Sequence, residues 1–244
     1  MNILVTGFEN FMGSYNPTQD IARALNGQHF FGVQVTGIVI PVSWGNAWKT
    51  VEAHIDESMK NGKKYDAVIN FGLDSMAQGI QLETIAHNNM NGTTPGADSK
   101  RAKVGKIYSG LPTNLNTIKA SLPITYLFDQ MAAVKGEEKS VITNVAPGKM
   151  LVTTTSIDAG DYLCNFTFFN NMYQYIDAST YQAISKYKGF IHVTGLGGSD
   201  AVKLADIQQS AAYVIKQVAK ELVRTAAQQA VTDNVVASVP KLLN

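Results

Sequence analysis

The distribution of apolar and polar residues along the chain predicts short strands that alternate with longer helices. Short apolar runs rich in β-branched residues predict strands at residues 2–6, 31–40, 65–71, 151–156 and 190–193. Apolar positions that recur every three or four residues predict helices at residues 19–26, 44–60, 124–134, 164–176 and 202–229. Such alternation favours right-handed crossovers, so we expect an α/β fold whose parallel sheet is covered on both faces.

Two segments depart from this alternation. Residues 88–120 are rich in Asn, Gly, Thr, Pro and Lys and have no hydrophobic period, which predicts a long irregular excursion over the surface. Excursions of this length within a compact domain are usually functional or mobile. The stretch from residue 231 onward has no convincing pattern. We therefore divide the chain into a single α/β domain at residues 1–229 and a C-terminal extension at residues 230–244.

Composition narrows the classes of function. The 244 residues are 45% hydrophobic and 16% charged, enough to bury a sizeable core. The net charge of +1, with no concentrated basic block, argues against a nucleic-acid or anionic-membrane partner. No apolar run approaches the length of a membrane span, and the start of the chain lacks the features of a signal peptide. We therefore expect a cytoplasmic location.

The single cysteine, Cys164, lies in the sequence DAGDYLCN at residues 158–165 and precedes a strongly apolar run. The pattern predicts a loop that delivers Cys164 to the first turn of a helix, where the positive end of the helix dipole favours a thiolate. A lone cysteine is also commonly a small buried apolar residue. The interpretation of Cys164 as a nucleophile is favoured by His192, which lies in the apolar sequence GFIHV, because a cysteine nucleophile needs a base.

A third residue is needed to orient the histidine, and an acid at the end of a strand or in a nearby loop would do so. Glu83 fits best, because it interrupts a run that would otherwise be half buried. A single glutamate in such a place is also commonly a surface residue.

Four motifs follow one another along the chain: GFENFMGSYNPT at residues 7–18, LETIAHN at 82–88, AGDYLCN at 159–165 and GFIHV at 189–193. In these motifs the chain resembles the pyroglutamyl peptidase I family, cysteine omega-peptidases that remove N-terminal pyroglutamate from peptides. The resemblance spans about residues 2–225. It implies a three-layer α/β/α sandwich with a twisted, mostly parallel sheet, no metal or other cofactor, and a possible dimer or tetramer.

The resemblance also implies roles for individual residues. Its catalytic triad falls on Cys164, His192 and Glu83. Its substrate-binding positions are Phe8, Phe11, Leu73 and Tyr162. The substrate would be a peptide with an N-terminal pyroglutamyl group, whose flat lactam ring suits aromatic faces and main-chain hydrogen bonds.

The chain departs from the family pattern in places, which makes it a divergent member. Asn10 stands where the family usually has proline, and Thr93 stands where it has arginine. Lys100, Arg101 or Lys103 could replace that arginine. The alternative function is therefore a hydrolase of another blocked peptide, or a non-catalytic binding protein.

Three other classes of function have less support. The opening sequence ILVTG resembles nicotinamide-dependent epimerases and reductases, but bulky Phe8 and Phe11 replace the glycine-rich turn that would admit a pyrophosphate. The glycine-rich residues 195–199 lack a Walker-type lysine. The remaining histidines, at positions 29, 54 and 87, are scattered, so a zinc site is not expected.

Overall fold

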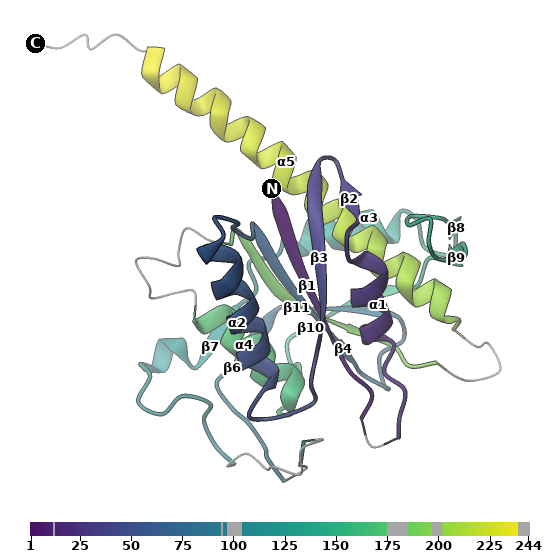
Figure 1. Cartoon of the computed structure of the whole chain (residues 1–244), viewed down its shortest axis with the longest axis vertical. Helices are drawn as coiled ribbons and strands as arrows, with labels where there is room; N and C mark the ends of the chain where they lie inside the picture. The colour runs from purple at the N-terminus through teal and green to yellow at the C-terminus, as the bar shows by residue number, and fades with distance from the viewer. Residues whose placement is uncertain (12, 94, 97–103, 175–184, 197–201, 239–244) are drawn as a thin grey trace, which may run out of the picture.

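A computed structural model describes residues 1–11, 13–93, 95–96, 104–174, 185–196 and 202–238 of the chain. At the centre of the described part lies a seven-stranded sheet in the order β10-β5-β11-β4-β1-β3-β2 (Figure 1). Its strands are β1 (Asn2–Phe8), β2 (His29–Phe30), β3 (Val33–Ile40), β4 (Ala67–Leu73), β5 (Ile80–Glu83), β10 (Thr153–Ser156) and β11 (Tyr187–Val193). Two small ribbons pair β6 (Ile85–His87) with β7 (Thr117–Lys119) and β8 (Glu138–Lys139) with β9 (Gly148–Lys149).

The sheet is mostly parallel. Strand β1 pairs in parallel with β3 and β4, β4 with β11, and β5 with β10. The antiparallel pairs are β5 with β11 and β2 with β3. The α/β class predicted from the sequence is thus confirmed, and the reversal at β5 adds a feature that the local pattern did not reveal.

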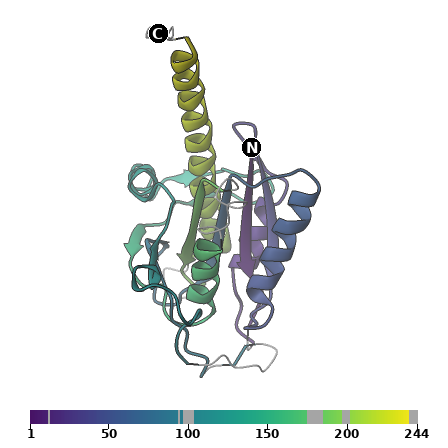
Figure 2. The same cartoon turned by 90° about the vertical axis from the view of Figure 1, so that its left-hand side faces the viewer.

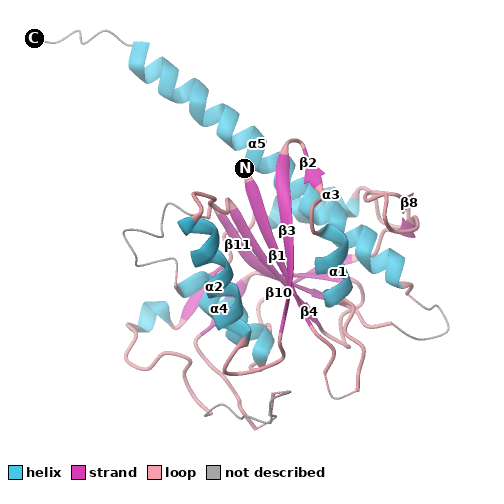
Figure 3. Cartoon of the chain, viewed as in Figure 1, coloured by secondary structure: helices cyan, strands magenta, loops and turns pink. Residues whose placement is uncertain are grey.

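Helices cover both faces of the sheet, as Figure 3 shows in cyan. They are α1 (Thr18–Leu25), α2 (Ala47–Lys60), α3 (Ile124–Ala132), α4 (Leu163–Tyr173) and α5 (Leu204–Ser238), with a short 3₁₀ helix, η1 (Thr113–Leu115). Along β1, Ile3 and Val5 pack in one core with α1, α3 and α5, whereas Leu4 packs in a second core with α2 and α4. This alternation, set by the period of a strand, produces three layers.

Several element boundaries differ from those predicted. The strand predicted at residues 31–40 begins at Val33, because Phe31 and Gly32 have φ angles of 53° and 77° and form a turn. The helix predicted at residues 19–26 begins one residue earlier, at Thr18, whose hydroxyl accepts a hydrogen bond from the N–H of Phe8 at 2.9 Å. Helix α4 is described as far as Tyr173, and residues 175 and 176 of the predicted helix lie outside the described residues.

The last helix is longer than predicted. Helix α5 continues to Ser238, so residues 231–238, for which no pattern was recognised, are helical. Its side chains are exposed from Ala226 to Asp233. This part projects beyond the sheet in both views (Figures 1 and 2). The boundary predicted between residues 229 and 230 therefore falls inside a continuous helix.

We expect a chain that ends at Gln229 to keep its free energy of unfolding within about 0.5 kcal/mol of the full-length value, because the removed residues that are described are exposed. Leu222→Ala in the buried part of α5 should instead cost about 2–5 kcal/mol, since Leu222 is 3% exposed. Urea unfolding of both variants checks this. A truncation as costly as the Leu222 substitution would show that the projecting turns stabilise the fold.

Candidate active site

Cys164 is the second residue of helix α4, in its first turn. The chain enters the helix through a turn at Gly160, whose φ is 78°, and an extended Tyr162. The N–H of Phe166 donates to the carbonyl of Tyr162 at 3.0 Å and closes the first turn. The predicted delivery of Cys164 to a helix N-terminus is therefore what the structure shows. The first-turn N–H groups of an α-helix have no acceptor within the helix, and their partial positive charge stabilises an anion.

A glycine in the sheet lets the thiol approach the strands. A Cβ atom at Gly72 would lie 3.0 Å from Sγ of Cys164 and 2.6 Å from the Phe190 ring. Gly72 is the register partner of His192 across the β4–β11 pair. The missing side chain thus leaves room for the sulfur directly beside the strand that carries the histidine.

His192 is bound to Glu83 deep in the sheet. Its Nδ1 donates to Oε1 of Glu83 at 2.8 Å, and the two side chains are 6% and 0% exposed. Nε2 of Gln81 donates to the same carboxylate oxygen at 2.9 Å. The antiparallel register of β5 and β11 brings these residues together, since Gln81 lies opposite His192 and Glu83 lies opposite Phe190.

The environment favours a charged imidazole. Burial alone would lower the pKa of His192, but charge and hydrogen bonding from Cys164, together with the same contributions from Glu83, raise that pKa to about 10. With Nδ1 occupied by Glu83, the other ring nitrogen is the one left for the thiol. The arrangement can therefore hold an imidazolium between a thiolate and a carboxylate, the activated form of a cysteine nucleophile.

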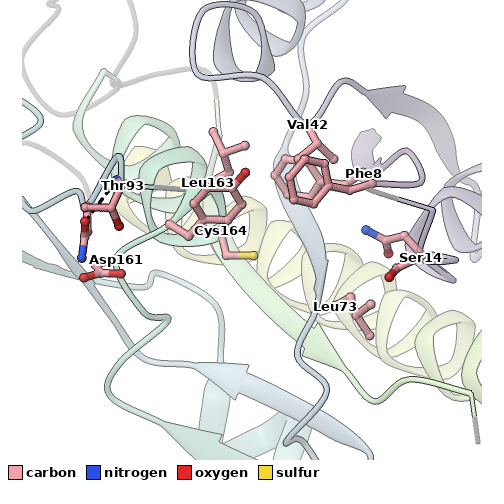
Figure 4. Close-up of a pocket in the computed structure, with 12 residues that line it drawn as sticks. Phe8, Ser14, Val42, Leu73, Thr93, Asp161, Leu163 and Cys164 are labelled. Atoms are coloured by element: carbon pink, nitrogen blue, oxygen red, sulfur yellow. Dashed lines mark hydrogen bonds between the residues drawn. The ribbon is translucent and has the colours of Figure 1, made fainter. Parts of the chain in front are cut away.

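A pocket of about 500 Å³ opens at Cys164. Figure 4 shows the sulfur between Phe8 and Val42 on one side and Thr93 and Asp161 on the other. The pocket is lined by Phe8, Phe11, Ser14, Asn16, Val42, Leu73, Asn91, Thr93, Asp161, Tyr162, Leu163 and Cys164. All four residues predicted to bind substrate thus line it together with the predicted nucleophile. His192 and Glu83 are not among the lining residues and are buried in the sheet.

Aromatic rings form much of the pocket wall. The ring of Phe11 lies 6.1 Å from that of Tyr162, in a tilted arrangement. The ring of Trp44 packs edge-on against that of Tyr162, with the ring centroids 5.2 Å apart. Sequence reasoning missed Trp44 and Val42. Their only signal was a position just beyond a predicted strand, at the edge of the sheet where α/β proteins place their sites.

The first loop is stabilised by the residue that replaces the family's proline. Oδ1 of Asn10 accepts hydrogen bonds from the N–H of Asn16 at 2.9 Å and from Nε2 of Gln19 at 2.5 Å. A side chain that bonds the backbone across a loop restricts it by a different route from the fixed φ of proline. The replacement therefore keeps a constrained loop beside Phe8 and Phe11.

The position of the family arginine also faces the pocket. Thr93 is exposed and lines the wall opposite Phe8 (Figure 4). Among the described residues that line the pocket, Asp161 is the only acidic or basic one. Lys100, Arg101 and Lys103, the suggested substitutes for the arginine, lie outside the described residues.

In the described part of the chain, no group of three or more histidine, cysteine, aspartate or glutamate side chains is arranged to hold a metal ion. No described helix combines the length and the hydrophobicity that crossing a membrane requires.

The fold and the site define a cysteine hydrolase of the exopeptidase type. The family model described as pyroglutamyl peptidase matches residues 1–233, and the chain belongs to this family. The pyrrolidone-carboxylate peptidase of Pyrococcus furiosus is 32% identical over 194 residues, which cover 79% of this chain and 80% of that protein. The enzyme of the same name from Thermococcus litoralis is 30% identical over 192 residues, covering 78% and 75%.

Solved structures agree with this assignment. A mutant pyrrolidone carboxyl peptidase from Pyrococcus furiosus superposes with a TM-score of 0.72 at 27% identity, covering 91% of this chain and 100% of that one. A crystallographic study of the same enzyme and its cysteine-free mutant gives a TM-score of 0.70 at 27% identity, covering 93% and 99%. These similarities confirm the predicted family, and identities near 30% confirm that the chain is a divergent member.

We expect Glu83→Gln to lower the pKa of His192 by about one to three pH units, because the substitution removes a buried negative charge and keeps the shape. The raised pKa stabilises the folded state fully below pH 6.5, and this contribution is lost as the pH rises through about 10. In the variant the loss should again begin near pH 6.5, but it should be smaller and should be complete at a lower pH. NMR titration of the His192 ring and thermal unfolding across this range check both effects.

Glu221→Gln is the matched control, since Glu221 pairs with Arg224 on helix α5. It should leave the His192 titration unchanged. A His192 midpoint that does not move in Glu83→Gln would contradict the assignment of Glu83 as the residue that holds the imidazolium.

Proposed function

We propose that the protein removes N-terminal pyroglutamate from peptides with a catalytic triad of Cys164, His192 and Glu83 and a thioester intermediate. The observation that carries the proposal is the His192 imidazole, bound to Glu83 at 2.8 Å and coupled to Cys164 at the base of the pocket. A purely binding protein would gain nothing from this buried, charge-coupled set, because burying ionisable groups costs free energy.

In the first step, His192 holds the proton released by Cys164, and the thiolate attacks the carbonyl that joins pyroglutamate to the next residue. A tetrahedral intermediate forms, with negative charge on the former carbonyl oxygen. The first-turn N–H groups of α4 are the natural donors to that oxygen, because they lie at the positive end of the helix beside Cys164. Glu83 keeps the imidazolium oriented throughout.

In the second step, His192 gives its proton to the departing amine and the carbon–nitrogen bond breaks, which leaves a thioester on Cys164. Water, deprotonated by His192, attacks the thioester carbonyl. The carbon–sulfur bond then breaks, 5-oxoproline leaves and the thiolate is restored. The cycle needs no redox partner.

The pocket suits a flat ring that carries no free amine. Its lining combines the apolar or aromatic Phe8, Phe11, Leu73 and Tyr162 with a few polar groups. A lactam ring can stack on the aromatic faces, and its N–H and C=O need hydrogen-bond partners. A free α-amine would need a carboxylate, and the acidic side chain among the described lining residues, Asp161, is exposed.

One observation favours a second candidate: a hydrolase of another N-terminal blocking group. Thr93 replaces the family's arginine at the pocket wall, so the described part of the wall lacks that positive charge. A pocket altered in this way could accept a different acyl group while the triad stays intact. A panel of amides of pyroglutamate, N-acetylated amino acids and proline separates the two candidates by their kcat/KM.

We expect Cys164→Ala to reduce the release of a fluorescent amine from a pyroglutamyl amide by a factor on the order of 10⁴ or more, since nothing else supplies the nucleophile. His192→Ala should lower both turnover and the alkylation of Cys164 by iodoacetamide at neutral pH. The measurements are steady-state fluorescence and mass spectrometry of the alkylated chain.

His54→Ala is the matched histidine control. His54 lies on helix α2 and bonds to Tyr65, outside the pocket, so turnover should persist. No turnover by the wild type, with Cys164 still reactive to iodoacetamide, would favour the second candidate. A Cys164 that does not react with iodoacetamide, together with no turnover, would refute the enzyme proposal and favour a binding role.

A further inference from the structure

Asn165, the residue after Cys164, is buried and forms hydrogen bonds with a segment that is distant in the sequence. The side chain of Asn165 is fully buried, in the first turn of α4. Its Oδ1 accepts a hydrogen bond from the N–H of His87 at 3.0 Å. Its Nδ2 donates to the carbonyls of His87 at 2.8 Å and Asn89 at 2.9 Å. One side chain thus satisfies three backbone groups about 78 residues away along the sequence.

The gripped segment leads into a loop over the pocket. We define the covering loop as residues 87–96, of which residue 94 lies outside the described part. It contributes Asn91 and Thr93 to the pocket wall. The N–H of Asn91 donates to the carbonyl of Asp161 at 2.7 Å, and the hydroxyl of Tyr162 donates to the carbonyl of Pro95 at 2.9 Å.

The contacts with the covering loop all come from the segment around Cys164. Asp161, Tyr162 and Asn165 flank Cys164 in the sequence, and each binds the covering loop. The loop is thereby attached to the same turn of chain that carries the nucleophile. A wall built in this way keeps its position relative to the sulfur.

We propose that Asn165 is a positioning residue that holds the covering loop over the pocket and so sets substrate affinity. The inference rests on the proposed function and adds a residue to it that does not touch the substrate. Asn165 acts through Asn91 and Thr93 on substrate binding, and the thiol chemistry of Cys164 and His192 is independent of it.

Asn88, which lies between the two residues that Asn165 binds, is attached separately. Nδ2 of Asn88 donates to the carbonyl of Tyr108 at 2.8 Å, and its Oδ1 accepts from the N–H of Tyr108 at 2.8 Å. The N–H of Asn88 donates to the carbonyl of Asn116 at 2.8 Å. Loss of the Asn165 side chain therefore frees the backbone of His87 and Asn89 at the start of the loop, while the contacts of Asn88 stay in place.

The same helix offers a matched control. Asn171 is also fully buried on α4, but it faces the sheet, where its Nδ2 donates to Oδ1 of Asn70 at 2.7 Å and to the carbonyl of Val68 at 3.1 Å. Substituting it removes a buried amide of the same kind from the same helix. It leaves the covering loop's contacts in place.

The experiment compares Asn165→Ala with Asn171→Ala. In Asn165→Ala we expect KM for a pyroglutamyl amide to rise about tenfold with kcat changed less than about threefold, the pattern of lost uniform binding. Alkylation of Cys164 by iodoacetamide should proceed at the wild-type rate. Hydrogen exchange of the His87 and Asn91 amides should accelerate. Asn171→Ala should lower the melting temperature and leave KM and these exchange rates unchanged.

Tyr162→Phe provides a second test if Asn165→Ala does not fold. It keeps the ring and removes only the hydroxyl that binds Pro95, so KM should rise about threefold, the loss expected from one hydrogen bond. An unchanged KM in Asn165→Ala would overturn the proposal. If Asn165→Ala does not fold, an unchanged KM in Tyr162→Phe would overturn it. An equal rise of KM in Asn171→Ala, or slower alkylation of Cys164 in Asn165→Ala, would also overturn it.

Failure of the proposed function gives a different result. If the wild type does not cleave the pyroglutamyl amide, the substrate assignment is wrong, and hydrogen exchange tests without any substrate whether Asn165 holds the covering loop. Faster exchange of the His87 and Asn91 amides in Asn165→Ala then supports the positioning role of Asn165. Unchanged exchange overturns it.

Discussion

The buried pair of Glu83 and His192 is the interaction on which the site depends. A carboxylate with no exposed surface is costly unless a positive partner compensates it, and the imidazolium 2.8 Å away supplies that charge. The antiparallel register of β5 and β11 brings them together, because Gln81 lies opposite His192 and Glu83, two residues further along β5, projects from the same face. The reversal of β5 within a mostly parallel sheet thus positions this ion pair, and the proposed chemistry depends on it.

Residues at both ends and on two faces of helix α4 contact the site or the elements around it. Its N-terminal turn holds Cys164, where the dipole favours a negative charge. At its C-terminal end, the buried ammonium of Lys188 donates to the carbonyl of Met172 at 3.2 Å, and burial lowers the pKa of that lysine to about 8. Asn171 faces the sheet, whereas Asn165 grips the covering loop. A helix with charges that suit both ends of its dipole is well placed to carry a thiolate.

Local sequence patterns predicted most of the elements and the position of Cys164 at a helix start, because hydrophobic period and turn residues act over a few positions. They did not predict the strand β5 at all, and its direction and the contact of Gly72 with the thiol depend on pairings between distant strands. Asn165 gave no signal either, since a buried asparagine looks like any polar residue in a helical run. The projecting part of α5 was missed for another reason: an exposed helix has no core to face, so its apolar residues need not recur with a helical period.

The departures from the family pattern have different physical consequences. Asn10 constrains the first loop, beside Phe8 in the pocket wall, through hydrogen bonds. Thr93 changes the electrostatics instead, because the described wall keeps the negative Asp161 and has no cation to offset it. In the proposed reaction, the negative charge that develops on the substrate oxygen would be stabilised by the N-terminal N–H groups of α4. Those groups act only at short range, so we expect the rate to depend closely on the position of the substrate carbonyl. The covering loop is attached to the turn that carries Cys164, which suits the positioning role proposed for it.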